Sequence, residues 1–396
     1  MKIAIDGRTI VRNKTGVGAY AERLVRSLLE IDRKNEYHLF LVEPNESLTA
    51  PNLTQVMIPG MHRAGRNRLW ENLLVPSYLH DQQIDVYFSP AYALPMLPRF
   101  RALGRMLPLP ERTRTMFNAR GRIKYIVTVH DLIGHIYPEY FTRKMRLWQQ
   151  LFISNAVKMA DCIMLDSMAT LNDLKNFYPS ADPKKLHVVY PDLDHRFAPL
   201  TEKEELSRVR ARYSLPEKFV LYVGTVEPRK NVAGLARGYA KLAGTLRQEY
   251  PLVIAGGLGW YSEGILSEIA ALNAGDSIRR IGYVDDADLP ALFNLASVFA
   301  FPSQYEGFGY PPLEAMACGI PVISSDRSSL PEAVGDAALI VDPDNPTQIA
   351  VELSRILTQP DLRAELKAKG FAQASQFRQN RCARQTLALI EQLCQA

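Results

Sequence analysis

Cysteine is scarce in this sequence, whose 396 residues contain four, at Cys162, Cys318, Cys382 and Cys394. None forms a C-x-x-C pair or stands beside histidines at zinc-finger spacing, so neither a structural zinc site nor a disulfide framework is indicated. Four unpatterned thiols are typical of a reducing compartment, in which each is a small, buried, apolar side chain.

Long apolar runs are missing too, because no stretch approaches the ~20 residues needed to span a bilayer. The first residues enter a strand pattern at once, without the apolar core of a signal peptide, which predicts a cytoplasmic protein. Glycine (23) and proline (26) are at ordinary levels, which excludes a collagen-like or low-complexity chain. The net charge of +5 suits an anionic substrate or a membrane surface and does not by itself indicate nucleic acid.

Short β-branched runs alternate with helical patterns almost throughout, which is the signature of an α/β fold. Strands are expected at 2–6, 37–42, 55–58, 85–88, 124–129, 162–165 and 186–189, and then at 219–223, 252–255, 278–284, 298–301, 322–324 and 339–341. Helical patterns include 18–29, 69–79, 142–159, 167–177, 232–242 and 380–395.

The periodicity lapses at 191–200, which predicts a link between two domains. We therefore predict two Rossmann-like doubly wound domains facing across a cleft, spanning 1–195 and 196–379, with a helix at about 380–396 that packs back on the first. Ligands of such sheets bind outside the carboxyl ends of the strands.

A basic stretch at 99–122 interrupts the alternation of strand and helix patterns. It contains one acidic residue and seven arginines: Arg99, Arg101, Arg105, Arg112, Arg114, Arg120 and Arg122. Two interpretations stay open: a solvated loop, or a patch that faces a membrane and gathers a phosphorylated lipid acceptor.

The segment Gly224-Thr225-Val226-Glu227-Pro228-Arg229-Lys230-Asn231 lies between an expected strand and an expected helix. Arg229 and Lys230 then stand at or just before a helix N-terminus, where the helix dipole makes two cations unfavourable. A bound phosphate would remove this conflict. The alternative is a turn whose long side chains reach solvent. The phosphate interpretation requires that the protein's own carboxylates do not already neutralise the pair.

The second segment runs from Ser303 to Gly319, with glycines at 307 and 309, a helix expected to start at Pro311 or Pro312, and Gly319 as its stop. Glu306 falls in the loop and Glu314 is expected in the first helical turn. Carboxylates at this spacing can hold hydroxyl groups at two points of a polar ligand, although Glu306 could equally be solvated and Glu314 could simply favour the helix dipole.

Together these segments resemble the retaining nucleotide-sugar glycosyltransferases of family 4, of the bacterial polysaccharide and O-antigen type, which have the GT-B architecture. The shared motifs are the Arg-Lys site and the two glutamates separated by seven residues. Further matches are 324–332, 335–338 and 341–343, and, more thinly in the first half, 6–7, 16–20 and 129–131.

The resemblance implies a role for each matching residue. Arg229 and Lys230 hold the donor diphosphate, Glu306 binds the donor sugar, and Glu314 takes the ribose hydroxyls. His130 lies against the sugar and its phosphate, while Gly16 lets a loop close on the phosphates. Backbone N–H groups of Phe308 and Gly309 assist, Val284 lies beside the base, and the donor-binding set also includes Gly18, Thr225, Ser303, Tyr310 and Leu313.

The resemblance further implies hexose transfer from UDP-glucose, or as a close second GDP-mannose, to a glycan or lipid-linked acceptor, without nucleic acid. Peripheral membrane contact through 99–122 belongs to the second of the two open interpretations of that stretch. The rivals are a GT-B sugar-nucleotide epimerase and a non-catalytic subunit of a polysaccharide assembly complex. Asp-x-Asp triplets occur at 192–194, 286–288 and 342–344. We interpret them as linker, helix N-cap and turn, so we expect neither a metal ion nor another cofactor.

Overall fold

The computed structural model describes residues 1–11, 16–58, 75–95, 123–272 and 274–395. The chain folds into two compact units, the first made of Met1–Asp192 with Gln379–Ala396 and the second of Leu193–Arg378. The predicted domain bounds lie within a few residues of this division. The basic stretch 99–122, with both of its interpretations, lies outside the described residues.

The first unit is built on a parallel sheet of seven strands in the order β3-β2-β1-β4-β5-β6-β7. The strand order reverses between β1 and β4, where Ile3 of β1 pairs with Tyr37 on one side and Val86 on the other. The strands are β1 (Lys2–Asp6), β2 (Glu36–Leu41), β3 (Leu53–Met57), β4 (Val86–Ser89), β5 (Lys124–Val129), β6 (Cys162–Leu165) and β7 (Leu186–Val188).

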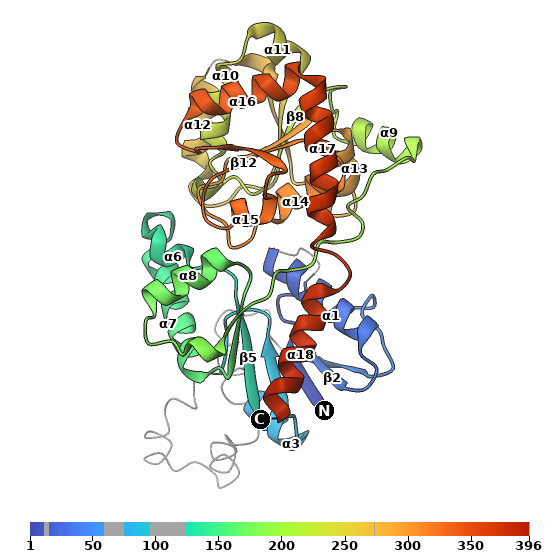
Figure 1. Ribbon diagram of the computed structural model, residues 1–396, viewed down its shortest axis with the longest axis vertical. Helices are drawn as coiled ribbons and strands as arrows, with labels where there is room; N and C mark the ends of the chain where they lie inside the picture. The colour runs from blue at the N-terminus through green and yellow to red at the C-terminus, as the bar shows by residue number, and fades with distance from the viewer. Residues whose placement is uncertain (12–15, 59–74, 96–122, 273, 396) are drawn as a thin grey trace. The chain divides into compact units, whose positions relative to one another are not determined.

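Helices cover both faces of this sheet, because successive side chains of a strand point to opposite sides. Ile3 and Ile5 join the core cluster that contains Leu24 and Ile390, whereas Ala4 joins the cluster on the other face. The helix α18 packs beside α1, as Figure 1 shows. The helices are α1 (Gly16–Ile31), α3 (Val75–Asp81), α6 (Ile133–Ile136), α7 (Arg143–Met159), α8 (Met168–Phe177) and α18 (Arg381–Gln395), with 3-10 turns at Pro138–Tyr140 and Pro183–Lys185.

The second unit has a parallel sheet of six strands in the order β10-β9-β8-β11-β12-β13, which reverses between β8 and β11. Its strands are β8 (Val220–Val223), β9 (Leu252–Ala255), β10 (Ile278–Gly282), β11 (Val298–Phe301), β12 (Val322–Ser325) and β13 (Ala338–Val341). Its helices are α9 (Lys203–Arg212), α10 (Val232–Ala240), α11 (Gly244–Glu249), α12 (Ser262–Ala271), α13 (Leu289–Leu295), α14 (Tyr310–Ala317), α15 (Leu330–Val334), α16 (Pro346–Thr358) and α17 (Pro360–Ser375), with 3-10 turns at Pro228–Lys230 and Gly275–Ser277.

The predicted α/β class and the two doubly wound units are confirmed. The predicted return of the last helix to the first unit matches α18, whose backbone N–H at Cys382 donates to the Asp192 carboxylate at 3.1 Å. Among the helices of the described residues, none is long and apolar enough to cross a bilayer.

Candidate active site

The order reversal in the second sheet brings two loops together at its carboxyl edge, where doubly wound sheets bind their ligands. The loop after β8 carries Arg229 and Lys230, and the loop after β11 carries Glu306. Glycine permits a close approach at this edge: a Cβ on Gly256, whose φ is +145°, would lie 2.0 Å from the Gly224 carbonyl oxygen. The backbone of Gln304 bonds to that of Arg229, so the two segments that the sequence singled out are neighbours.

The Arg-Lys pair occupies a single 3-10 turn, Pro228–Lys230, directly before α10, as predicted. Asn231 joins the turn to the helix in the left-handed region, with φ +52°. Its amide donates to the carbonyl oxygens of Pro302 at 3.0 Å and Pro343 at 2.8 Å. These bonds tie the turn to the loop after β11 and fix where the two cations lie.

Two carboxylates of the protein neutralise this pair, which corrects the expectation that a bound anion would be needed. Glu306 accepts from Arg229 Nη1 and from Lys230 Nζ, both at 2.7 Å. Glu227 Oε1 lies 2.6 Å from Arg229 Nε. The condition stated from the sequence, that no carboxylate of the protein neutralises the pair, is therefore not met. Glu227, which stands two positions before Arg229, had no predicted role.

Burial opposes the ionised form of Glu306, but Arg229 and Lys230 outweigh it and lower the pKa of this carboxyl to about 2. Burial dominates at Glu227, whose pKa is raised in spite of Arg229. Burial and the neighbouring Arg229 lower the pKa of Lys230, against the pull of Glu306. The cluster therefore holds one firmly ionised carboxylate and one that takes up a proton more readily than an exposed glutamate.

We predict that the Glu306 carboxylate makes the fold sensitive to acid. Its pKa falls from an ordinary 4.5 to about 2 on folding, so its contribution to stability is complete above about 4.5 and is lost as pH falls toward 2. The contribution at neutral pH is on the order of 3 kcal/mol. Denaturant unfolding between pH 7 and 3 should therefore show a shallower acid loss for Glu306→Gln than for the wild type. The exposed Glu36→Gln should keep the wild-type slope, and an unchanged slope in Glu306→Gln would contradict the assignment.

The loop from Ser303 to Gly309 is held at both ends. Ser303 Oγ lies 2.7 Å from the Glu306 carboxylate and 2.9 Å from the Arg229 carbonyl oxygen. The backbone N–H of Gln304 donates to the same carbonyl at 2.7 Å. At the other end Gly309 has φ +109°, and a Cβ there would lie 2.7 Å from Leu330. Only glycine fits this position without strain.

The helix α14 starts at Tyr310, one residue before the earlier of the two predicted starts, and this moves Glu314 to its fifth position. Glu314 is therefore half-buried beyond the first turn, which corrects the expectation from sequence. The predicted stop is confirmed, because Gly319 has φ +78° and the N–H groups of Gly319 and Ile320 donate to Met316 and Ala315. This is the Schellman arrangement that glycine favours.

The other predicted donor-binding residues of this unit lie at the same edge with different exposure. Thr225 is exposed, whereas Ser303 and Leu313 are fully buried. Phe308 packs edge-on against Tyr310, with ring centroids 5.4 Å apart. Val284, which follows the edge strand β10, is buried. The complete burial of Leu313 gives it a packing role in this structure.

In the first unit, His130 follows β5 and is buried with both ring nitrogens facing protein acceptors. Nδ1 lies 2.6 Å from Asp166 Oδ2 and Nε2 lies 2.7 Å from the Pro90 carbonyl oxygen. Burial opposes the charge, but Asp166 prevails and raises the pKa of His130. Its N–H groups are thus engaged within the unit. Asp166, at the end of the neighbouring strand β6, is a partner that the sequence analysis missed.

The two predicted glycines of the first unit lie in α1. Gly16 is its first residue and is exposed, whereas Gly18 is buried. Residues 12–15 lie outside the described residues, so the predicted closing loop remains a prediction.

Five of the six aspartates of the Asp-x-Asp triplets pair with arginines, and the sixth, Asp192, accepts from the N–H of Cys382 at the start of α18. Asp194 and Asp286 both pair with Arg196, and Asp342 and Asp344 with Arg327. Asp288 stands at the N-cap position of α13, but its carboxylate pairs with Arg208 and Arg212 instead of capping the helix. Within the described ranges, no group of three or more His, Cys, Asp or Glu side chains is placed to hold a metal ion.

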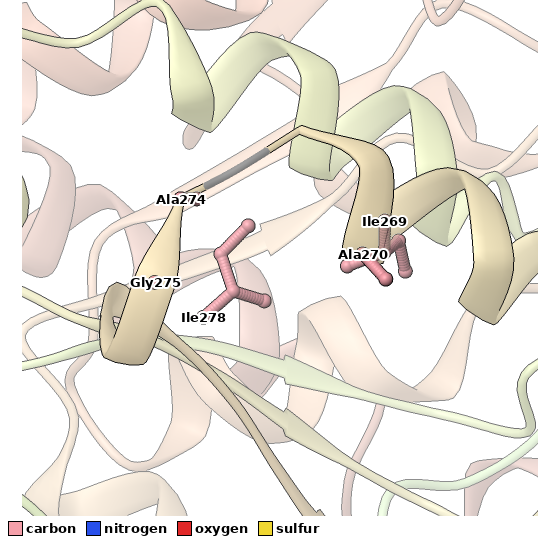
Figure 2. A pocket seen from close by; sticks show the side chains of 5 residues that line it. All are labelled: Ile269, Ala270, Ala274, Gly275 and Ile278. Carbon is pink, nitrogen blue, oxygen red and sulfur yellow. The ribbon is translucent and has the colours of Figure 1, made fainter.

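A cavity of about 360 Å³ lies elsewhere in the second unit, lined by Ile269, Ala270, Ala274, Gly275 and Ile278 (Figure 2). Ile278 opens β10, so the cavity lies at the amino edge of the parallel sheet, opposite the loops described above. The side chains that line it are apolar, and none of them is titratable. The charged cluster is therefore the better candidate for chemistry.

Comparisons with known proteins agree with this geometry. Residues 204–373 match the family model of the glycosyl transferases group 1, and residues 14–197 match that of Glycosyltransferase Family 4. The O-antigen chain mannosyltransferase B of Escherichia coli is 30% identical over 395 residues, which cover 98% of each chain. The serotype-specific mannosyltransferase WbdA of Escherichia coli is 30% identical over 262 residues, 64% of this chain and 32% of its own.

Among solved structures, Anabaena HepE in complex with UDP and glucose superposes with a TM-score of 0.72. The match covers 99% of this chain and 100% of that one at 16% identity, so it shows a common fold. The family models account for each unit in turn, and the Escherichia coli relative accounts for nearly the whole chain. This chain is therefore a glycosyltransferase, and it belongs to the family 4 glycosyltransferases of GT-B architecture.

Proposed function

We propose that this glycosyltransferase moves a mannosyl residue from a nucleotide-diphosphate sugar to a glycan or lipid-linked acceptor in the synthesis of a bacterial envelope polysaccharide. The support is the relative named as an O-antigen chain mannosyltransferase, which this chain matches over nearly its full length. A second relative is also named a mannosyltransferase. Because both names specify mannose, we favour GDP-mannose over UDP-glucose as the donor, which reverses the order expected from sequence.

The observation that carries the proposal is the Arg229–Lys230 turn at the front of α10. Glu306 and Glu227 neutralise the pair, against the condition stated from the sequence, but the Lys230 ammonium has three N–H donors and its bond to Glu306 uses one of them. A diphosphate held there gains from the cations and from the helix N-terminus. As the sugar–phosphate bond lengthens, negative charge grows on the leaving oxygen. Preorganised cations then stabilise the transition state more than the bound donor.

The remaining roles are proposed from the resemblance. Glu306, with the backbone N–H groups of Phe308 and Gly309, binds sugar hydroxyls, and Glu314 binds the ribose. Val284 lies beside the base. His130 acts through its charge, because its ring nitrogens already face Asp166 and Pro90.

We further propose that transfer retains the configuration at the anomeric carbon. The bond between that carbon and the phosphate oxygen breaks, and the acceptor oxygen bonds to the carbon on the same face. The acceptor proton passes to the leaving phosphate. This route needs no protein nucleophile.

A panel of UDP, GDP and ADP with their sugars, tested by thermal unfolding, examines the proposal. A ligand that binds only the folded state raises the unfolding midpoint. At a ligand concentration of one hundred times Kd it adds about 2.7 kcal/mol to the free energy of unfolding. We expect the largest shift with GDP and GDP-mannose. Conversion of the donor into an epimeric nucleotide sugar without any acceptor would instead favour an epimerase, and no shift with any nucleotide would contradict the proposal.

We expect transfer to need no divalent metal, because the proposed charge stabilisation comes from Arg229 and Lys230. Activity should stay within about twofold after treatment with EDTA and gel filtration. Adding back Mg²⁺ or Mn²⁺ serves as the control. A strict requirement for either ion would contradict the role given to the two cations.

A further inference from the structure

A short serine-rich turn, residues 325–329, begins at the last residue of β12 and lies within the segment 324–332 that also carries the family resemblance. Because β12 pairs with β11, the turn lies beside the loop that carries Glu306. Its serine hydroxyls lie within hydrogen-bond distance of the backbone of three residues of that loop, Ser303, Glu306 and Phe308. The turn is therefore placed to determine where Glu306 lies.

Ser328 bonds to both sides of the Glu306 peptide backbone. The Glu306 N–H donates to Ser328 Oγ at 2.8 Å, and the same hydroxyl donates to the Glu306 carbonyl oxygen at 2.7 Å. Ser329 Oγ lies 2.8 Å from that carbonyl oxygen and 2.8 Å from the carbonyl oxygen of Phe308. Side-chain hydroxyls thus fix the Glu306 backbone on both sides of its Cα.

The start of the same loop is fixed in the same way. Ser325 Oγ donates to the Ser303 carbonyl oxygen at 2.6 Å. Ser303 in turn bonds through its own hydroxyl to the Glu306 carboxylate. Ser325 and Ser329 are fully buried, so water does not compete readily for these bonds.

Ser328 adopts a backbone conformation that a serine does not favour. Its φ is +48°, in the left-handed region that L-residues other than glycine rarely occupy. A hydroxyl is present at a position where glycine would fit without strain. Strain of this kind tends to be kept where a site needs a group in one place.

We propose that Ser328 and Ser329 are positioning residues, which hold the Glu306 backbone so that its carboxylate meets Lys230, Arg229 and the donor sugar. We call the hydrogen bonds from Ser328 and Ser329 to the Glu306 loop the clamp. The contact between Glu306 and the sugar rests on the proposed function, whereas the clamp rests on the hydrogen bonds alone. A carboxylate displaced by about 1 Å can reduce turnover by about 100-fold. Loss of the serine hydrogen bonds should therefore lower kcat and leave the affinity for the nucleotide nearly unchanged.

Ser328→Gly tests the clamp, because it removes the hydroxyl and relieves the backbone strain together. We expect its unfolding midpoint to equal or exceed that of the wild type, while kcat falls about 10-fold to 100-fold and donor KM changes less than about threefold. Ser328→Asn, which tolerates the left-handed region and offers a donor and an acceptor, should recover part of the loss. Ser329→Ala should lower kcat in the same direction.

The chain offers a matched control. Ser214 is exposed and has nearly the same φ, +49°. Ser214→Gly makes the same chemical change at a serine that takes no part in the bonds to the Glu306 loop described above, so its kcat should equal that of the wild type. A Ser328→Gly enzyme with kcat within twofold of the wild type would overturn the positioning role, as would a loss that follows a fall in stability.

Amide hydrogen exchange of the peptide covering residues 303–309 separates this inference from the proposed function. The peptide should exchange faster in Ser328→Gly than in the wild type or Ser214→Gly, whichever donor the enzyme uses. Faster exchange in a protein that transfers no sugar would sustain the clamp and refute the function. Unchanged exchange would refute the clamp even if transfer proceeds.

Discussion

Lys230→Ala should lower kcat/KM for sugar transfer by about 100-fold to 1,000-fold, the cost typical of removing one preorganised group that stabilises developing charge. The ammonium group is buried, 2.7 Å from Glu306 and 5.0 Å from the centre of the Phe301 ring. Its removal takes one cation from the proposed diphosphate site. Of the two cations that bond to Glu306, only Arg229 then remains. Initial rates at saturating acceptor measure the effect.

Stability must be measured alongside, because breaking one side of a buried ion pair can cost about 3–5 kcal/mol. We expect Lys230→Ala to remain folded, with a lowered unfolding midpoint and an unchanged far-ultraviolet circular dichroism spectrum. Lys218→Ala is the control, since it removes an exposed lysine that pairs with Glu249 at 2.6 Å. Such a surface pair contributes about 0–1 kcal/mol, and the control should keep full activity. Near-normal turnover in Lys230→Ala would remove this residue from the site.

Glu306→Gln should separate binding of the sugar from binding of the diphosphate. The substitution keeps the shape of the side chain and removes the charge that neutralises Arg229 and Lys230. Free nucleoside diphosphate should then bind as tightly as to the wild type or more tightly, because the site gains one net positive charge. Transfer should fall by about 100-fold or more, because the proposed contact with the sugar loses its charged acceptor.

Glu314→Gln provides the contrast. Its proposed partner is the ribose, so it should weaken nucleotide binding and sugar transfer together. Isothermal titration with GDP and UDP, combined with initial rates, distinguishes the two patterns. If Glu306→Gln weakens nucleotide binding as much as it weakens transfer, the assignment of Glu306 to the sugar is wrong.

Much of the fold could be predicted from the sequence because buried parallel strands leave a strong local signal. The bounds of β1, β5, β6, β9 and β11 are those expected from their short apolar runs. The starts of α7 and α8 follow their N-caps, where Thr142 and Ser167 accept from the backbone N–H groups of Met145 and Thr170. The predicted start of α14 was too late. Gly309 stands at the N-cap position, so the helix begins at Tyr310, before the prolines that indicated its start.

The candidate site was harder to predict because its groups come from loops far apart in the chain. Local charge rules identified Arg229 and Lys230, but they could not show that Glu306 lies 2.7 Å from both. Glu227 was visible in the motif, and its burial was not. The bonds from Ser328 to Glu306 join two loops through a side chain and a backbone, and no periodicity in a sequence encodes such a contact.

The central claim is that the Arg229–Lys230 turn before α10 binds the diphosphate of the donor. A crystal structure with GDP, or with whichever nucleotide gives the largest thermal shift, tests this most directly. The account predicts phosphate oxygens within about 3 Å of Arg229 and Lys230, at the carboxyl edge of the second sheet. A diphosphate bound elsewhere, with both cations still engaged only by Glu306 and Glu227, would contradict it.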